Sequence, residues 1–207
     1  MVDAEASAVA GATAGELTEA QREVCESVIA LSNWVPGHVR QVKRIAGWLY
    51  DELRPYHGLG DDERVLLLAA ALLHDVGYPT DPARHHKVSA RIVRAHLGPP
   101  FTPEQIDLIA LLARYHRKAV PKLKHRRYAA LAADQQRVLC WLGGVLRVAD
   151  GLDRAHDAAV GAVQAARPDG RVEIRAGGAS DEDVRGAMGK RDLLERSLGM
   201  AVVVRAA

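Results

Sequence analysis

One apolar stretch limits what this chain can fold into. Residues 65–73 read VLLLAAALL, and His74, Asp75, Val76 and Gly77 follow directly. We expect an apolar helix that ends at Gly77, because glycine commonly terminates helices. Neighbouring residues on a helix point about 100° apart, so an adjacent His and Asp converge on one ion only where the helix is ending. The pair is therefore either a hydrogen-bonded helix end or part of a metal site.

The composition is that of a globular protein. The chain has 207 residues, of which 48% are hydrophobic, and can form one sizeable core with a small appendage. Residues 1–15 have neither the basic start nor the apolar run of a signal peptide, and residues 65–73 are too few to span a bilayer. We therefore expect a cytoplasmic protein with no membrane partner. Cys25 and Cys140 are isolated, which excludes a disulfide framework and a zinc ribbon, and both are expected to be buried.

Hydrophobic residues recur at helical spacing through most of the chain. Capping boxes are expected at Thr18 and Thr102, and Asp61 or Asp62 can cap the apolar helix. The expected helices cover residues 18–32, 38–53, 61–75, 85–97, 102–116 and about 134–156.

The pattern changes after residue 157, where short apolar runs alternate with turn residues. Strands are expected over residues 160–165, 172–175 and 201–204, with a helix from Ser180 to Ser197. The fold class is therefore mainly α. We expect a flexible N-terminal tail (residues 1–16), a helical domain (17–158) and a small C-terminal α/β extension (159–207).

Several polar residues lie at the ends of apolar helix faces. His38 begins the apolar face of the helix 38–53, and His116 ends that of the helix 102–116. A lone inward histidine is usually a hydrogen-bonded core residue. Asp150 and Asp153, however, both end the apolar face of the last long helix, and buried carboxylates must be paired or must bind a cation.

Basic side chains gather beside His116. Residues 114–133 contain seven Lys and Arg residues and no acid. Such a run is usually a solvated loop. A nucleic-acid site is disfavoured, because the formal net charge is only +2 and the segment offers only Tyr115 and Tyr128 for base stacking. Two interpretations stay open, which are a solvated loop and a surface that neutralises phosphate groups near His116.

The order His, His-Asp, Asp along the helices resembles the HD-domain superfamily of metal-dependent phosphohydrolases. The resemblance implies an all-helical bundle that holds a divalent metal between its helices. The metal ligands that it implies are His38, His74, Asp75 and Asp150. Superfamily members with additional histidines bind a second ion, and the matching positions here are His85 or His86, and His116.

A closer resemblance rests on five segments: LHDVGY at 73–78, HHK at 85–87, RYHRK at 114–118, PKLKH at 121–125 and RVADGLDR at 147–154. These look like the C-terminal HD portion of the exopolyphosphatase and guanosine pentaphosphate phosphohydrolase (Ppx/GppA) family, over roughly residues 20–205. KRDLLE at 190–195 is also similar. In that family an actin-like ATPase-fold half ahead of the HD portion carries the phosphatase chemistry, and none of these 207 residues corresponds to it.

Imidazole and carboxylate ligands suit Mn, Fe, Ni, Zn or Mg, as one or two ions. Asp75 is the natural bridge between two ions, and a metal-activated water would attack a phosphorus atom. A non-ligating His85 or His86 is the candidate leaving-group acid, and Asp153 is a further catalytic candidate. The residues expected to bind substrate phosphate are Lys87, Arg114, Arg117, Lys118, Lys122 and Arg147. His57, His96 and His156 are assigned to the surface or to local hydrogen bonds.

Two functions follow as expectations. The first is a phosphohydrolase acting on a phosphorylated small molecule, a nucleotide or polyphosphate. The alternative is a non-catalytic module that binds polyphosphate or a nucleotide through the same basic surface. The oligomeric state is open, with a homodimer as one alternative.

Overall fold

The computed structural model describes residues 14–32 and 37–207. Residues 1–13 of the expected tail, and Pro36, lie outside the described part. The helices that precede the sheet are α1 (Glu19–Ala30), α2 (Gly37–Glu52), α3 (Arg54–His57), α4 (Asp61–Leu73), α5 (His85–His96), α6 (Pro103–Tyr115), α7 (Arg126–Ala129) and α8 (Ala133–Gly151). The C-terminal elements are β1 (Ala162–Ala166), β2 (Val172–Gly177), α9 (Asp181–Met188), α10 (Asp192–Leu198) and β3 (Val202–Ala206).

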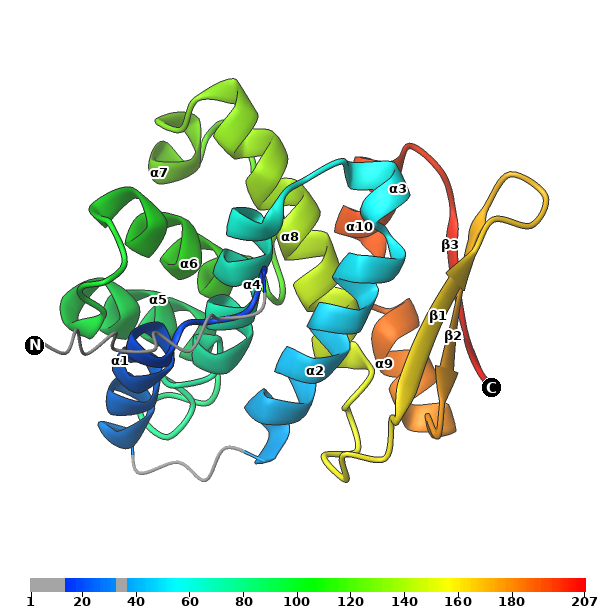
Figure 1. Ribbon diagram of the computed structural model, residues 1–207, viewed down its shortest axis with the longest axis horizontal. Helices are drawn as coiled ribbons and strands as arrows, with labels where there is room; N and C mark the ends of the chain where they lie inside the picture. Colours follow the sequence, from blue (N-terminus) through cyan, green and yellow to red (C-terminus); the bar gives the residue numbers. More distant parts are fainter. Residues whose placement is uncertain (1–13, 33–36) are drawn as a thin grey trace, which may run out of the picture.

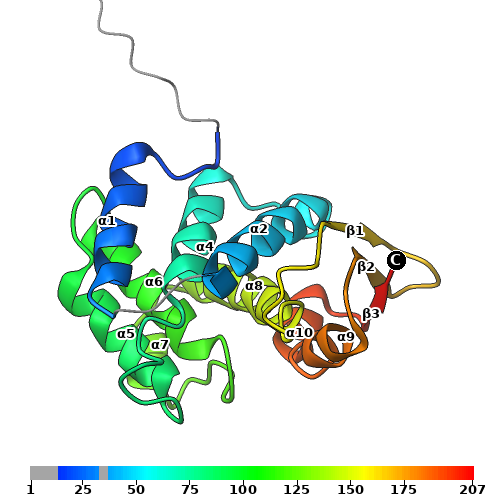
Figure 2. The ribbon, with the colours of Figure 1, turned by 90° about the horizontal axis from the view of Figure 1, so that it is seen from below.

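Helix α4, the apolar stretch, lies at the centre of the bundle (Figures 1 and 2). It contacts α1, α2, α6 and α8, and every residue from Leu66 to Leu73 is buried. Burial of apolar surface, which stabilises the folded state by about 25 cal/mol per Å², is the main contribution that holds such a bundle together. The prediction of a mainly α fold around this helix is confirmed.

The helix starts follow from local capping. Thr18 and Thr102 form the two predicted capping boxes, each accepting from the backbone of the glutamine three residues later. The predicted cap of α4 is wrong, because the N-cap residue is Gly60 and the helix begins at Asp61. Glu63 accepts from the Gly60 N–H at 2.8 Å, so the side chain that satisfies this helix start comes from the first turn.

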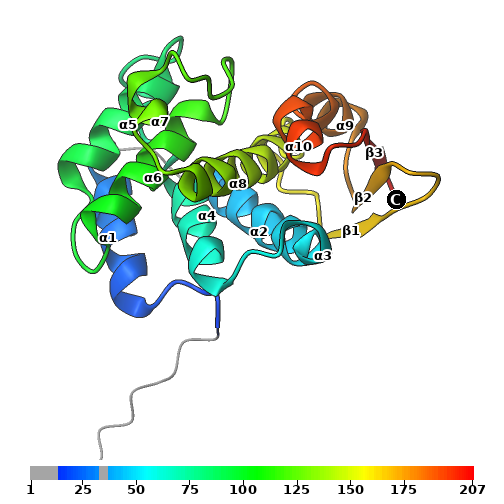
Figure 3. The same ribbon diagram turned by 90° about the horizontal axis from the view of Figure 1, so that it is seen from above.

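The C-terminal extension is a three-stranded sheet in the order β1-β2-β3, with two helices between it and α8 (Figure 3). β1 pairs antiparallel with β2, and β2 pairs parallel with β3. Helices α9 and α10 both contact α8, and α9 also contacts β3. Hydrogen bonds also join the extension to α2, from Gln41 Nε2 to Val160 O and from Ala165 N to Glu52 Oε2.

Three local predictions are corrected. The single helix from Ser180 to Ser197 is two helices, because Gly189 weakens a continuous helix and Arg147 Nε takes the Lys190 carbonyl as a partner at 3.2 Å. Helix α8 ends at Gly151 and not near residue 156. His156 and Ala158 have φ of 58° and 55°, which a helix does not allow. Cys25 is buried as expected, but Cys140 is only half-buried.

No helix in the described part of the chain is both long and apolar enough to cross a membrane.

Candidate metal centre

The turn that follows α4 is fixed by its contact with α5. A Cβ on Gly77 would lie 2.5 Å from the backbone nitrogen of Ser89, so only glycine allows this approach. Gly77 N also donates to Ser89 Oγ at 2.9 Å. The close contact holds His74, the C-cap of α4, and Asp75 in the interior, where His74 has 0% relative exposure.

Four buried histidines are oriented in the same way. In each, Nδ1 contacts an oxygen that can only accept, so Nδ1 carries the proton and Nε2 carries the lone pair in the neutral ring. The four contacts are His38 to Asp153 Oδ2 at 2.7 Å, and His74 to Ala71 O, His85 to Pro82 O and His116 to Ala113 O, each at 2.8 Å.

The Nε2 atoms of three of these rings surround one carboxylate oxygen. Asp75 Oδ1 lies 3.2 Å from His85, 3.5 Å from His116 and 3.8 Å from His74. The Nε2 atoms of His85 and His116 are themselves 3.2 Å apart. Asp75 Oδ1 and His74 Nε2 are buried and have no hydrogen-bond partner among residues 14–32 and 37–207. Lone pairs that face one another without a donor fit a cation between them.

The ligand atoms form two groups that share Asp75. One group is His38, His74 and Asp75, and the other is Asp75, His85 and His116. Within each group the candidate ligand atoms lie within 4.8 Å of one another. The donor set of imidazole and carboxylate therefore fits two neighbouring divalent ions with Asp75 between them.

Asp150 lies beside these groups and not within them. Its Oδ1 is 3.4 Å from His38 Nε2, and its Oδ2 accepts from Lys190 Nζ at 2.5 Å. Burial raises the pKa of Asp150, but Lys190 and His38 outweigh it and hold the pKa well below its usual range. Burial lowers the pKa of His38, while Asp150 and Asp153 raise it to about 9. The negative charges of Asp150 and Asp153 thus favour a proton or a metal cation bound to His38.

His85, His86 and His116 favour the neutral form, because burial lowers the pKa of each. Burial and the nearby His74 lower the pKa of His116 to about 3. Burial, followed by the positive charge of Arg114, lowers the pKa of His86 to about 4. Neutral imidazole is the form that binds a metal ion.

An open cavity of about 500 Å³ gives access to the site. Its lining includes His38, Asp75, His85, His116 and Asp150. Sequence reasoning missed Pro82 and four lining residues with polar side chains, which are Tyr78, Arg154, His156 and Lys190. The assignment of His156 to the surface is incomplete, because its exposed ring stacks on His38 with centroids 4.1 Å apart. His57 makes the expected local hydrogen bonds, and His96 is exposed.

The predicted residues do not all meet at this cavity. Arg117 does, with Nη1 3.3 Å from His85 Nε2, the ring nitrogen that carries the lone pair. His86 lies outside both ligand groups, and its ring centroid is 6.5 Å from that of His116. Asp153 faces His38 and the Ala158 N–H.

The remaining candidates for phosphate binding lie elsewhere. Lys118 Nζ donates to Ala83 O at 3.0 Å, and Lys122 is exposed outside the cavity lining. Arg147 is 4% exposed and donates to Tyr115 O and Asp192. Lys87 and Arg114 line a different cavity.

Fold and site together define a helical bundle with a buried His/Asp cluster and a small α/β extension. The family model for Ppx/GppA phosphatase, domain III, matches residues 36–173, which is more than half of the chain. The chain belongs to this family. The match confirms the Ppx/GppA relationship that the sequence segments indicated, and the matched range contains all four oriented histidines. A search of curated proteins found no match.

Proposed function

We propose that this protein is a metal-dependent phosphohydrolase of the HD-domain type. Its substrate would be a phosphorylated small molecule, a nucleotide or polyphosphate. The family relationship supports a phosphorylated substrate. The observation that carries the proposal is the convergence of Nε2 lone pairs on Asp75 Oδ1, a buried oxygen that has no hydrogen-bond donor in the described part of the chain.

In this proposal His38, His74 and Asp75 hold one ion, and Asp75, His85 and His116 hold the other. A bound divalent ion supplies Lewis-acid polarisation of phosphoryl oxygens and activation of water. Burying these imidazole and carboxylate groups without a cation costs free energy. This cost favours a bound metal ion at the site. The cavity volume of about 500 Å³ falls in the range of small-molecule sites.

The chain's own cations complete the site. Arg117 lies against His85 at the cavity wall, and Lys190 and Arg154 also line the cavity. Guanidinium and ammonium groups bind phosphate oxygens through charge-assisted hydrogen bonds and stabilise charge that develops on them. We assign these three residues to the orientation of the substrate phosphate.

A non-catalytic binding module is the second candidate. It is favoured by the state of Asp150, the fourth predicted ligand, whose Oδ2 is bonded to Lys190 at 2.5 Å. An internal ammonium group thus neutralises one carboxylate beside the site. A metal ion could then stabilise the bundle while the cavity only binds a phosphorylated ligand.

The test combines metal analysis with a screen of phosphate monoesters, diesters, nucleotides and polyphosphate. Wild-type protein should copurify with metal and hydrolyse one of these classes. His74→Ala and the nearly isosteric Asp75→Asn should lose metal. Their kcat/KM should fall by more than the roughly 10–100-fold that an outer-shell partner costs, with a far smaller loss of folding stability.

His96→Ala is the matched control, because His96 is an exposed histidine at the end of α5. It should keep wild-type metal content and turnover. If metal-loaded wild-type protein hydrolyses none of these substrate classes, the enzyme proposal is wrong and the binding module is the function that the result supports. Asp75→Asn protein that retains stoichiometric metal would contradict the metal centre itself.

A further inference from the structure

One cation of the metal centre comes from the C-terminal extension. Lys190 lies between α9 and α10, and its Nζ donates to Asp150 Oδ2 at 2.5 Å. The other oxygen of Asp150 lies 3.4 Å from Nε2 of His38, a member of the first ligand group. The Asp150 carboxylate therefore lies between a candidate metal ligand and an ammonium group.

The backbone of Lys190 is held in place by the helix that carries Asp150. Arg147 is buried and lies one turn before Asp150 on α8. Its Nε donates to the Lys190 carbonyl at 3.2 Å, and its Nη2 donates to Asp192 Oδ1 at 2.8 Å. Residues three apart on a helix share a face, so one face of α8 carries both the carboxylate and the anchor of the lysine. The packing of α8 against the extension thus builds the contact between Lys190 and Asp150.

The ammonium group of Lys190 keeps donors for a second partner. An ammonium group has three N–H donors. Among residues 14–32 and 37–207, Asp150 is the only hydrogen-bond or ion-pair partner of Lys190 Nζ. The lysine also lines the cavity at the metal centre, where its side chain is 23% exposed. Its remaining donors are therefore available to an oxyanion in that cavity.

The charges around the cavity oppose a metal ion at Asp150. The lining contains the cations Arg117, Arg154 and Lys190, and the carboxylates Asp75 and Asp150. A divalent ion would bring further positive charge to a carboxylate that an ammonium group already neutralises. Two cations that share one carboxylate repel each other, and burial strengthens this repulsion. Asp150 therefore binds a divalent ion more weakly while Lys190 is bonded to it.

We propose that Lys190 competes with a divalent ion for Asp150, and that an oxyanion in the cavity ends this competition by accepting the hydrogen bonds of the lysine. The inference rests on the proposed metal centre and describes its regulation. The divalent ion and the oxyanion each raise the affinity of the site for the other, because such coupling is reciprocal. The site therefore binds its metal most tightly when a phosphoryl group or a similar oxyanion is present.

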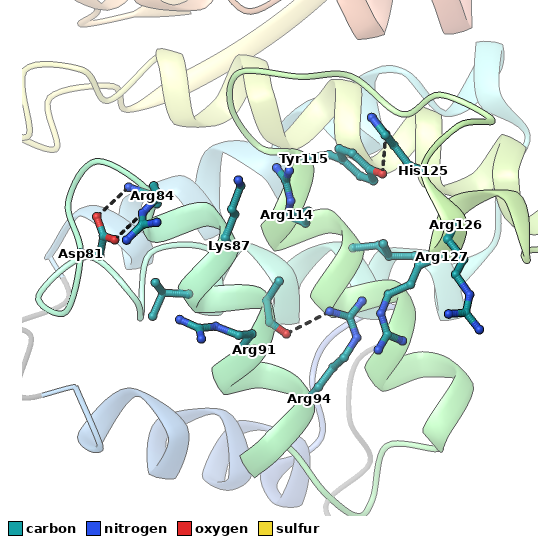
Figure 4. Close-up of a pocket in the computed structure, with 13 residues that line it drawn as sticks. Asp81, Arg84, Lys87, Arg91, Arg94, Arg114, Tyr115, His125, Arg126 and Arg127 are labelled. Atoms are coloured by element: carbon teal, nitrogen blue, oxygen red, sulfur yellow. Dashed lines mark hydrogen bonds and ion pairs between the residues drawn. The ribbon is translucent and has the colours of Figure 1, made fainter.

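The neighbouring cations provide matched comparisons. Among the described residues, no other Lys or Arg forms an ion pair with Asp75 or Asp150. Arg154 lines the same cavity without touching either carboxylate. Lys87 is exposed and faces a separate cavity between α5, α6 and α7 (Figure 4), which shares no lining residue with the cavity at the metal centre. Variants of these two residues separate the direct contact of Lys190 from the general effect of positive charge.

The test is titration of the metal-free full chain with Mn²⁺ at one fixed pH, with free Mn²⁺ measured by electron paramagnetic resonance. Lys190→Met should bind Mn²⁺ about tenfold more tightly than wild type, because a charged hydrogen bond no longer opposes the ion. Lys87→Met removes the same charge outside the site, and it should change the affinity by less than about threefold. Arg154→Gln should also change the affinity less than Lys190→Met does.

Methylphosphonate, which has no ester bond to hydrolyse, is the oxyanion probe. Saturating methylphosphonate should raise the Mn²⁺ affinity of wild type by about tenfold. In Lys190→Met the increase should be about threefold or less, because there is no competition to relieve. Lys190→Arg keeps a cation at this position and should keep most of the wild-type increase. Lys190→Gln, a milder change than Lys190→Met, should give intermediate values in both titrations.

Thermal unfolding of each metal-free variant verifies that it is folded. An Mn²⁺ affinity of Lys190→Met and Lys190→Gln that equals or falls below that of wild type would overturn the proposal and make Lys190 a purely structural partner of Asp150. Equal increases with methylphosphonate in wild type and Lys190→Met would also overturn it. Failure of the metal centre itself gives a different result, because Asp75→Asn would then bind Mn²⁺ as wild type does.

Discussion

The four oriented histidines differ in what holds each Nδ1. In His74, His85 and His116 the acceptor of the Nδ1 hydrogen bond is a backbone carbonyl three residues earlier. The local helix end or turn therefore sets the orientation of the ring. In His38 it is the carboxylate of Asp153, 115 residues away in the chain. A carboxylate partner fixes the tautomer and also raises the basicity of the ring. Asp153 is therefore a positioning residue for His38.

This role predicts the effect of Asp153→Ala on metal affinity. Without its partner, His38 can rotate, and outer-shell losses of this kind cost about 10–100-fold in affinity. Competition with a coloured chelator measures the change. Asp153→Asn keeps an acceptor oxygen and should lose less.

Asp157→Ala is the control, because Asp157 is exposed and, among the described residues, accepts only from the nearby Ala159 N–H. An Asp153→Ala protein that binds metal as tightly as wild type would show that His38 is not a ligand, or needs no orientation.

Much of this constellation was accessible from the sequence, because helical periodicity places a residue on a buried face. That argument located His38, His74 and His116. It could not choose between His85 and His86, which point about 100° apart on the first turn of α5. It also could not find Lys190, whose place beside Asp150 depends on how α9 and α10 pack against α8.

At the scale of elements, two glycines of α8 determine that packing. A Cβ on Gly151 would lie 2.5 Å from the Cα and N of Ala187 in α9. A Cβ on Gly144 would lie 2.8 Å from the Cα and N of Leu194 in α10. Both helices thus approach the α8 backbone directly. The segment between them, with Lys190, is thereby held over Asp150.

Gly151→Ala should therefore separate α9 from α8. The clash is with backbone, which cannot rotate away, and overpacking of this kind costs about 1–3 kcal/mol or more. The free energy of unfolding in urea measures the loss. Gly143→Ala on the same helix is the matched control, since its Cβ would meet only the ends of two side chains, Leu193 Cδ2 at 3.1 Å and Leu112 Cδ2 at 3.9 Å.

Alanine favours a helix interior over glycine by up to about 1 kcal/mol, so the control should remain within about that range of wild type. Equal stabilities of the Gly151 and Gly143 variants would contradict the close contact between α8 and α9.

The sequence predicted most elements, because capping residues and apolar spacing are local signals. The error over residues 180–197 arose where a long-range contact decides. Arg147, buried in α8, binds the Lys190 carbonyl and the Asp192 carboxylate at the break between α9 and α10. No local pattern in residues 180–197 reveals that partner, so the segment reads as one helix.

At the scale of the whole molecule, the bundle and the C-terminal extension share one continuous core. Leu146 of α8, Leu194 of α10 and Val204 of β3 belong to the same buried apolar cluster. The family match ends at residue 173, within β2, and so crosses the predicted boundary between residues 158 and 159. These observations favour an extension that is required for the stability of the bundle.

A fragment of residues 1–158 tests this directly. It would expose the α8 face that α9 and α10 cover, and it would leave the buried Arg147 guanidinium without Asp192 and the Lys190 carbonyl. An unpaired buried charge and a newly exposed apolar face are both strongly destabilising. We expect the full chain to melt in one cooperative transition, and the fragment to aggregate or to melt without cooperativity when heated. A fragment that melts cooperatively near the melting temperature of the full chain would instead show that the extension is not needed for the stability of the bundle. Lys190 would then be an addition to a site that is complete without it.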